Sequence, residues 1–446
     1  MNHFSRRRFL QTTVAGTAAL AAFPWLKSFG NSPNDTIRMG FIGLGQQTNN
    51  LIGGFNKIPG VQIVAGADVY DIKRQRFEQR VKAFNQAKNL NAGVSVYKDY
   101  REVLDRKDID AVVIATPDHW HALIALDACS AGKDIYQEKP ITFTIREGIK
   151  VAEAVRKNHV IFATGSQQRS DHNYQHAVNM VHREAIGKLR KVFAYVGPGP
   201  DPYNLPEEKI PAGLDWKQWL GPLKAVHYNP ALNPPITLDP PQNETYWARW
   251  RYFKETGGGF VCDWGAHNFD IGQWGLAKDH SGPVKIIPPG YQGTQNLTFV
   301  YDNGLEMINE PYDNKKTLGI KFWGSDGWIE VSRGSIAASD PALLPSKEAV
   351  AEAGKYEDSP IHIIDFINSV RSRRDPIAPV EVGHRTATVS ILGTIALELK
   401  RAVHWSPDHQ YFINDPEAEK YFHRPYENGY QRSEEHTSEL QSPNTI

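Results

Sequence analysis

The amino-acid sequence predicts an α/β protein of two parts: a doubly wound parallel sheet, then an α+β domain with a largely antiparallel, open sheet. Three observations predict this. Short apolar strands alternate with helical segments from residue 37 to residue 165, a spacing typical of parallel sheets. From residue 296 to residue 331, strands follow one another without intervening helices, which favours antiparallel pairing. The length of 446 residues fits two domains better than one.

Composition excludes several classes of function. Lys plus Arg and Asp plus Glu number 50 each, so no net charge favours nucleic acid or an anionic membrane as a partner. Cys129 and Cys262 are the only cysteines, which excludes a disulfide framework and a four-cysteine zinc site. His119 and His121 lack a third convergent ligand and are interpreted as polar groups at a helix start. No metal site is therefore predicted.

Both ends of the chain are set apart from the fold. Residues 5–10 (SRRRFL) precede a short, weakly apolar run and resemble a twin-arginine export signal, so residues 1–33 are interpreted as signal peptide and linker. A basic anchor helix is the alternative, although the run is short for a membrane span. No Cys follows it, which excludes a lipoprotein anchor. We expect a periplasmic protein without a stable membrane anchor.

Residues 432–446 resemble a translated sequencing-adapter oligonucleotide and are interpreted as an assembly artefact.

A nucleotide-binding pattern opens the first domain, which is assigned to residues 34–165. An apolar strand over 37–42 runs into a glycine-rich turn and then a helix, and a second apolar strand over 61–67 ends at an acidic residue. This is the order of the Rossmann dinucleotide fold, where glycines let the backbone approach the pyrophosphate at a helix N-terminus. The residues expected to contact the cofactor here are Gly43, Leu44, Gly45, Gln46, Gln47 and Asp68.

Asp68 bears on the choice of cofactor. It lies 23 positions after Gly45 (68 − 45), where a carboxylate accepts hydrogen bonds from both ribose hydroxyls. A carboxylate repels a 2′-phosphate, so NAD is favoured over NADP, while Lys73 and Arg74 keep NADP open. Thr48 occupies the place of the third glycine of the pattern, which serves helix packing more than phosphate contact.

Further strands, at 95–97, 111–115, 134–137 and 160–165, alternate with helices that include one over 144–158. Ligands of open α/β sheets bind beyond the carboxyl ends of the strands. Pro140 ends the strand at 134–137 and favours an extended Lys139, whose ammonium then points off the sheet edge. His119 is expected to be partly exposed. The residues expected near the cofactor at these strand ends are Thr116, Pro117, His121, Glu138 and Lys139.

The second domain is assigned to residues 166–431. A helix over 174–183 and a strand over 191–196 precede a proline-rich stretch, 197–242, and a hairpin is centred on residues 325–327. Helices over 362–371 and 386–403 close the fold. The proline-rich stretch and its flank contain Trp216, Trp219, Trp247 and Trp250. These indoles either pin the loop to the core or stack on sugar rings, and both interpretations stay open.

Asp263 and His267 are four residues apart, so on a helix they share one face. Oxidation of a carbinol needs a base, and His267 has the most suitable side chain because an ordinary histidine titrates near neutral pH. Lys139 would stabilise a developing alkoxide, and Asp263 would orient His267 or contact a second hydroxyl. The alternatives are a surface helix with a satisfied Asp–His pair, and a metal site with Cys262, which lacks a second imidazole.

Three separated signatures, Gly43-Leu44-Gly45 with Asp68, Glu138-Lys139-Pro140, and Asp263-x-x-x-His267 after three glycines, together resemble the glucose–fructose oxidoreductase / inositol dehydrogenase (Gfo/Idh/MocA) family. The resemblance covers residues 36 to 428. It implies that Lys139, Asp263 and His267 act at the nicotinamide, and that the protein forms a homo-oligomer. Arg169, Trp250 and His267 are expected to contact the substrate.

These observations predict an NAD(P)-dependent oxidoreductase that acts on a hydroxyl of a sugar, polyol or glycoside. Two alternatives remain, a glycosidase- or epimerase-like enzyme that oxidises its substrate transiently and a non-catalytic nucleotide-binding sensor. An exported enzyme works where the nicotinamide pool is poor, which favours tightly held NAD(H) and a redox-neutral cycle.

Overall fold

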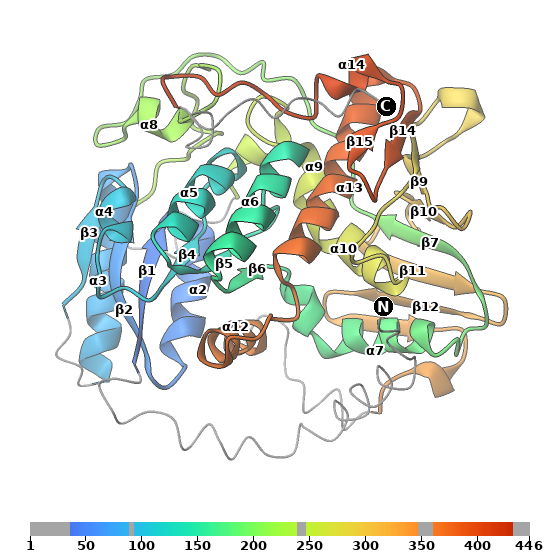
Figure 1. Cartoon of the computed structure of the whole chain (residues 1–446), viewed down its shortest axis with the longest axis horizontal. Coiled ribbons are helices and arrows are strands. Elements are labelled where there is room, and N and C mark those ends of the chain that lie inside the picture. The colour runs from blue at the N-terminus through green and yellow to red at the C-terminus, as the bar shows by residue number, and fades with distance from the viewer. Residues whose placement is uncertain (1–35, 89–92, 239–246, 347–359, 431–446) are drawn as a thin grey trace.

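The computed structural model describes residues 36–88, 93–238, 247–346 and 360–430, which form two sheets flanked by helices (Figure 1). The predicted signal segment and the predicted artefact lie outside these ranges. In the described part of the chain, none of the helices combines the length and apolar character that crossing a membrane requires.

The first sheet has six parallel strands in the order β3-β2-β1-β4-β5-β6. All four side chains of β4 and of β5 are buried, as expected where helices cover both faces of a parallel sheet. The order reverses between β1 and β4, so a crevice is expected beyond the carboxyl ends of these two strands. The strands are β1 (Ile37–Ile42), β2 (Val61–Ala67), β3 (Ser95–Tyr97), β4 (Ala111–Ile114), β5 (Asp134–Gln137) and β6 (Phe162–Thr164).

The helices of the first domain are α2 (Gln46–Asn56), α3 (Asp71–Ala87), α4 (Arg101–Leu104), α5 (Asp118–Ser130) and α6 (Ile145–Asn158). A capping box of Thr144 and Glu147 fixes the start of α6. A further helix, α12 (Ile361–Ser372), packs on this sheet as well, because Ile363, Phe366 and Ile367 join its apolar core. The chain thus returns to the first domain after the second sheet, which the predicted linear boundary at residue 165 did not include.

The second sheet has nine strands in the order β13-β12-β11-β7-β10-β9-β8-β14-β15. Among its described pairs only β7 with β10 is parallel, so the largely antiparallel sheet is confirmed. The strands are β7 (Leu189–Tyr195), β8 (Lys285–Ile287), β9 (Thr298–Val300), β10 (Glu306–Ile308), β11 (Gly319–Gly324), β12 (Trp328–Ser332), β13 (Ser335–Ala338), β14 (Val403–Ser406) and β15 (Tyr411–Phe412).

The helices of this part are α7 (His172–His182), α8 (Trp216–Leu220), α9 (Gly259–Asp263), α10 (Gly265–Gly275), α13 (Val380–Leu399) and α14 (Pro416–Glu419), with 3-10 turns that include η4 (Gln167–Ser170) and η5 (Arg249–Tyr252). The last long helix was predicted over 386–403. It instead begins after Pro379 and ends where Lys400 turns to a left-handed backbone, which leaves Val403 free to start β14.

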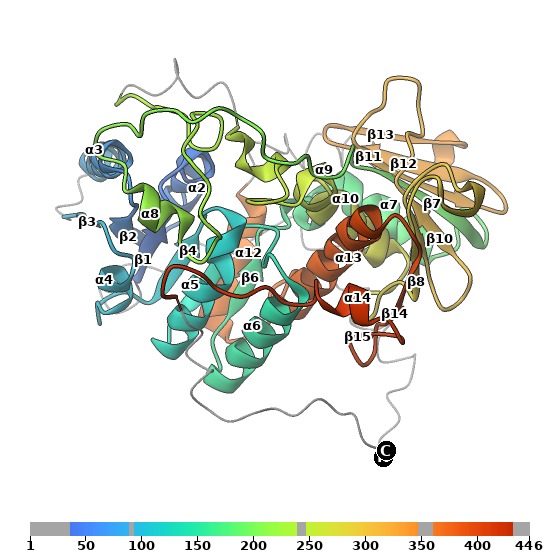
Figure 2. The same ribbon diagram turned by 90° about the horizontal axis from the view of Figure 1, so that it is seen from above.

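A single apolar core joins the domains. It runs from α5 and α6 through α13 and α10 to the second sheet. Figure 2 shows α6 and α13 side by side between the two sheets. The proline-rich segment that carries α8 lies along the top of the first domain in Figure 1, over the carboxyl ends of its strands. Leu214 of that segment bridges to Tyr70 just after β2.

Candidate functional site

The glycine-rich turn after β1 has two glycines with different tasks. Gly43 has φ +84°, and a Cβ there would lie 2.6 Å from the Thr116 backbone nitrogen, so the fold itself requires glycine. Gly45 has an ordinary φ of −79°, and a Cβ there would meet no protein atom within 4 Å. The space beside Gly45 is therefore open where a pyrophosphate approaches the N-terminus of α2.

Thr48 stands where the usual pattern has its third glycine. Its buried hydroxyl donates a hydrogen bond to the Gly43 carbonyl oxygen at 2.5 Å. A glycine at this position would only leave room for α2 to pack close to the turn. Thr48 instead holds α2 and the turn together by this hydrogen bond.

Asp68, at the end of β2, is held by the backbone around it. Its carboxylate accepts hydrogen bonds from the backbone N–H of Leu44 (2.8 Å) and of Tyr70 (2.9 Å). Two cations lie beside it: Lys73 donates to the Asn233 side chain at 2.9 Å, and Arg74 donates to the Asp68 carbonyl oxygen at 2.5 Å. The position at the cleft wall fits the ribose contact predicted from sequence.

A cleft opens between the glycine turn and the proline-rich segment. Asp68, Thr116 and Pro117 line one wall, and Gln218, Trp250 and Arg251 line the other. Three buried polar atoms in this lining have no hydrogen-bond partner among the residues that the structure describes: Oγ1 of Thr116, Oε1 of Gln218 and Nδ2 of Asn233. Partnerless polar atoms and the open space at Gly45 fit a polar ligand such as a dinucleotide. Further lining residues from the predicted set are Gly43, Gly45, Gln46 and Gln47.

The tryptophans divide between the two interpretations. Trp216 and Trp219 stack on each other, with ring centroids 4.5 Å apart, and both are buried in the core of the proline-rich segment. This pair pins the segment, although Trp219 also lines the cleft. Trp250 is likewise buried and lines the cleft, and the Arg251 guanidinium lies 4.3 Å from its ring centroid.

The Glu138-Lys139-Pro140 stretch follows β5, and its last peptide bond is cis. The buried Glu138 carboxylate accepts hydrogen bonds from Gln47 and Gln167, each at 2.9 Å, and burial raises its pKa. Lys139 leaves the sheet edge and donates to Asp263, at 2.6 Å to Oδ1 and 2.9 Å to the backbone oxygen. The structure thus brings together residues that are 124 positions apart.

Asp263 ends α9 and His267 lies in α10, one turn later. Asp263 pairs with Lys139, so of the two predicted roles the orienting of His267 is not seen. Burial by itself raises the pKa of Asp263, but the charges of Lys139, Arg251 and Arg333 bring it below its ordinary value. Burial, followed by the charges of Lys139 and Arg333, lowers the pKa of His267 well below its ordinary value. The site therefore combines an ionised carboxylate with a neutral imidazole at neutral pH.

Arg333, in the turn between β12 and β13, joins the site although no sequence pattern predicted it. Its Nη2 donates to Nε2 of His267 at 3.1 Å, and its guanidinium lies 4.6 Å from the Trp264 ring centroid. A lone arginine before a glycine in a hairpin is usually a solvated turn residue, and it lies 66 positions from His267. Only the return of the chain through the second sheet places it here.

One histidine differs from its predicted place. His119 was predicted to be partly exposed, but it is buried, because its Nε2 contacts the Trp219 carbonyl oxygen at 2.9 Å under the proline-rich segment. His121 was expected near the cofactor. Its ring lies between the carbonyl oxygens of Pro140 (2.7 Å) and Thr116 (2.9 Å), behind the cleft wall to which Thr116 belongs. Leu44 is likewise buried in the core and contributes its backbone N–H to Asp68.

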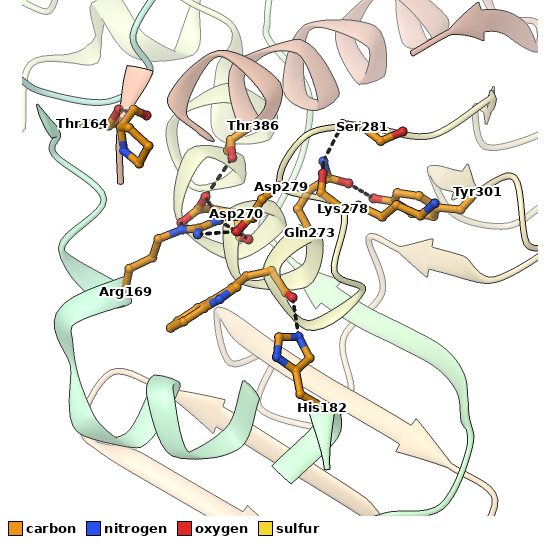
Figure 3. Close-up of polar contacts among 12 residues, drawn as sticks. Thr164, Arg169, His182, Asp270, Gln273, Lys278, Asp279, Ser281, Tyr301 and Thr386 are labelled. Carbon is orange, nitrogen blue, oxygen red and sulfur yellow. Dashed lines mark hydrogen bonds and ion pairs between the residues drawn. The ribbon is translucent and has the colours of Figure 1, made fainter. Parts of the chain in front are cut away.

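Arg169 does not have the free donors that the predicted substrate contact needs. It is 1% exposed and forms ion pairs with Asp270 (2.8 Å) and Asp279 (2.7 Å), as Figure 3 shows. Thr386 donates to the same Asp270 at 2.8 Å. These contacts join η4, α10 and α13. They anchor the helix that carries His267, which corrects the prediction for Arg169.

A second set of hydrogen bonds holds the later part of α10 (Figure 3). Gln273 donates to the carbonyl oxygens of Lys278 and Ser281 and accepts from the Tyr301 hydroxyl at 2.6 Å.

Among the residues that the structure describes, no group of three or more His, Cys, Asp or Glu side chains is arranged to hold a metal ion. The groups available for chemistry beside the cleft include the Lys139 cation, the Asp263 carboxylate and the neutral His267 imidazole.

Known proteins share this architecture. Residues 37–166 match an oxidoreductase family with an NAD-binding Rossmann fold, and residues 189–432 match the C-terminal alpha/beta domain of the same Gfo/Idh/MocA family. A glycosyl hydrolase family 109 protein of Shewanella sp. (strain ANA-3) is 29% identical over 209 residues, which cover 42% of this chain and 45% of the relative. The chain spans about half the length of the curated relatives that it matches.

Two solved structures share the fold. The WlbA dehydrogenase from Chromobacterium violaceum, in complex with NADH and UDP-GlcNAcA, is similar with a TM-score of 0.60 at 15% identity, over 84% of this chain and 98% of its own. The aldose-aldose oxidoreductase from Caulobacter crescentus, complexed with glycerol, gives a TM-score of 0.53 at 16% identity, over 83% and 99%. At these identities the likeness concerns the fold alone.

Proposed function

The chain belongs to the Gfo/Idh/MocA family of NAD(P)-dependent oxidoreductases, and from this premise we propose that it acts on a secondary hydroxyl of a sugar, polyol or glycoside. One observation carries the proposal: Lys139, at the end of β5, forms an ion pair with Asp263, one helical turn before His267, and its charge acts on the His267 imidazole. Such a meeting of base and cation is what carbinol oxidation requires.

The roles of the three residues follow from their surroundings. His267 is neutral at working pH, which is the protonation state that a base for the hydroxyl proton needs. Lys139 donates a hydrogen bond to the same oxygen and stabilises its developing charge, while Asp263 holds the ammonium in place. An oxidised nicotinamide held in the cleft would accept the hydride from the same carbon. The glycine turn, Asp68 and Thr116 would hold that cofactor.

NAD is the proposed cofactor, because the Asp68 carboxylate stands at the cleft wall beyond β2. Lys73 and Arg101 line the same cleft, and a 2′-phosphate bound by them would reverse the choice. Denaturing the purified protein and identifying the released nucleotide by mass spectrometry, followed by titration of the emptied protein with NAD and NADP, decides between the two.

A second candidate function is favoured by the relatives named as glycosyl hydrolase family 109 proteins. In such an enzyme the substrate would be oxidised transiently, the aglycone would leave by elimination, water would add to the resulting double bond, and the keto group would be reduced again, so that NAD is regenerated. The test is to dialyse the protein, incubate it with a panel of glycosides and measure released aglycone and NADH separately. Aglycone without net NADH supports the cleaving enzyme, whereas stoichiometric NADH supports the plain dehydrogenase.

We also propose that the protein is exported in folded form with its cofactor bound. The support is the SRRRFL motif at residues 5–10, which lies outside the described residues. Replacing Arg6 and Arg7 together by Lys should leave full-length precursor in the cytoplasm, as seen by fractionation and immunoblotting. Replacement of Arg8 alone by Lys is the control. Periplasmic protein from the double variant in normal amount would contradict the proposal.

A further inference from the structure

The site around His267 carries more positive than negative charge. The proposed oxidation needs only one cation there, Lys139. Lys139, Arg251 and Arg333 all act on the single carboxylate of Asp263. The next carboxyl group, Asp118, is buried, and burial raises its pKa to about 7 despite the nearby Arg251 and Lys139. It is therefore only partly ionised at neutral pH and offsets only part of the positive charge. A site with this excess of cations favours an anionic ligand.

One of these cations, Arg333, also forms a hydrogen bond with His267, the predicted base. Nη2 of Arg333 donates to Nε2 of His267 at 3.1 Å, so the lone pair that should accept the hydroxyl proton is already in use. The other ring nitrogen, Nδ1, is buried, and none of the described residues forms a hydrogen bond with it. Guanidinium groups always carry their charge and donate only, so this contact requires a neutral imidazole with its proton on Nδ1. For His267 to act through Nε2, Arg333 must turn to another acceptor.

The place of Arg333 suits such a change of partner. It lies in the two-residue turn between β12 and β13 and is exposed, while its guanidinium lies over the Trp264 ring, 4.6 Å from the centroid. An indole face lets a guanidinium slide in its own plane without losing contact. The same plane presents two parallel N–H groups, which match the two oxygens of a carboxylate.

We propose that the substrate carries a carboxylate, as a uronic acid or its glycoside does, and that Arg333 binds this group and thereby releases Nε2 of His267. Arg333 is then the residue that selects the substrate class, and only an anionic substrate frees the base. In the reaction the hydroxyl proton passes to Nε2, the hydride of the same carbon passes to the nicotinamide, and the carboxylate remains unchanged. This inference rests on the proposed function and narrows it.

The experiment uses the full-length mature protein loaded with NAD and matched pairs of methyl glycosides: glucuronide with glucoside, galacturonide with galactoside, and mannuronide with mannoside. Hexosides sulfated at position 6 test whether Arg333 also accepts a sulfate group in place of the carboxylate. We expect kcat/KM for one uronide to exceed that of its neutral partner by about 100-fold or more, because an analogue that leaves a site's polar group unpaired is strongly rejected. Arg333→Gln should abolish that ratio, and Arg333→Lys should restore only part of it.

Arg183→Gln, an exposed arginine after α7, is the matched control and should keep the ratio. The pH dependence of kcat/KM is a second measurement. It distinguishes a role of Arg333 at His267 from a purely structural role of Arg333. Arg333 contributes to lowering the pKa of His267, so Arg333→Gln should move the acid limb of the kcat/KM profile to higher pH. An unchanged ratio and an unchanged pH profile in Arg333→Gln would overturn the assignment, and so would a neutral hexoside used as well as its uronide.

Failure of the proposed function looks different. If no glycoside of either kind is turned over, binding to the NAD-loaded protein, measured by calorimetry, decides the inference alone. Binding of a uronide that is weakened about tenfold or more in Arg333→Gln, with no binding of the neutral partner, supports a carboxylate site in a protein of another activity. Absence of uronide binding overturns it.

Discussion

At the scale of single residues, Lys139 and His267 carry the chemistry. Lys139→Ala and His267→Ala should each lower turnover by roughly 10²- to 10⁴-fold, because one removes the cation at the oxygen and the other the base. Bound nucleotide, measured after denaturation, should remain, since neither side chain lines the cleft. Lys157→Ala and His280→Ala, both exposed, are the controls. Near-normal turnover of either active-site variant would remove that residue from the mechanism.

The two glycines of the turn after β1 offer a matched pair. Gly45→Ala should leave the free energy of unfolding within about 0.5 kcal/mol of the wild type, because its Cβ meets no protein atom within 4 Å, but it should weaken nucleotide binding. Gly43→Ala should destabilise the fold, because its φ is +84° and its Cβ would meet the Thr116 backbone at 2.6 Å. Urea unfolding and NAD titration separate the two. Equal loss of stability in both variants would contradict this account.

At the scale of elements, the ion pairs of Arg169 decide where α10 lies. Arg169→Met should lower the free energy of unfolding by about 3–5 kcal/mol, because it leaves the carboxylates of Asp270 and Asp279 without their partner. Adding Asp270→Asn should recover part of that loss. A substrate-binding role for Arg169 would instead raise KM at unchanged stability. Chemical denaturation and kinetics of the single and double variants distinguish the two roles.

At the scale of the whole molecule, the domains are joined where α6 crosses α13, and His384 of α13 is buried there. A Cβ on Gly148 of α6 would lie 2.2 Å from its ring, and Nε2 contacts the Gln410 side-chain oxygen at 2.5 Å. Burial, partly offset by Gln410, lowers the pKa of His384 to about 4, whereas an unfolded histidine titrates near 6.5. Between these values the unfolded chain binds more protons, so stability falls as pH falls.

The measurement is the free energy of unfolding of wild type and His384→Asn as pH is lowered. At neutral pH the variant should be less stable, because the contact with Gln410 is lost. The gap should narrow by about 1.4 kcal/mol for each pH unit between about 6.5 and about 4, since only the wild type must keep this histidine neutral. His280→Asn is the surface control. A gap that does not change with pH would contradict burial of a neutral His384.

Local pattern was enough to predict the order of the elements in the first domain, the glycine turn and Asp68, because these depend on periodicity, on backbone freedom and on the residue that ends a strand. That Lys139, Asp263 and His267 act at one place was expected only from the family resemblance, and the ion pair of Lys139 with Asp263 was not predicted. The boundaries of α13, the burial of His119, the ion pairs of Arg169 and the approach of Arg333 to His267 depended on which distant segments pack together. Arg169 illustrates the limit: its charge suggested a ligand, but a charge in a core is satisfied by whichever carboxylates the fold brings near it. Arg333 shows the opposite case: its sequence context suggested an ordinary turn residue. It contacts His267 only because the second sheet packs against α10.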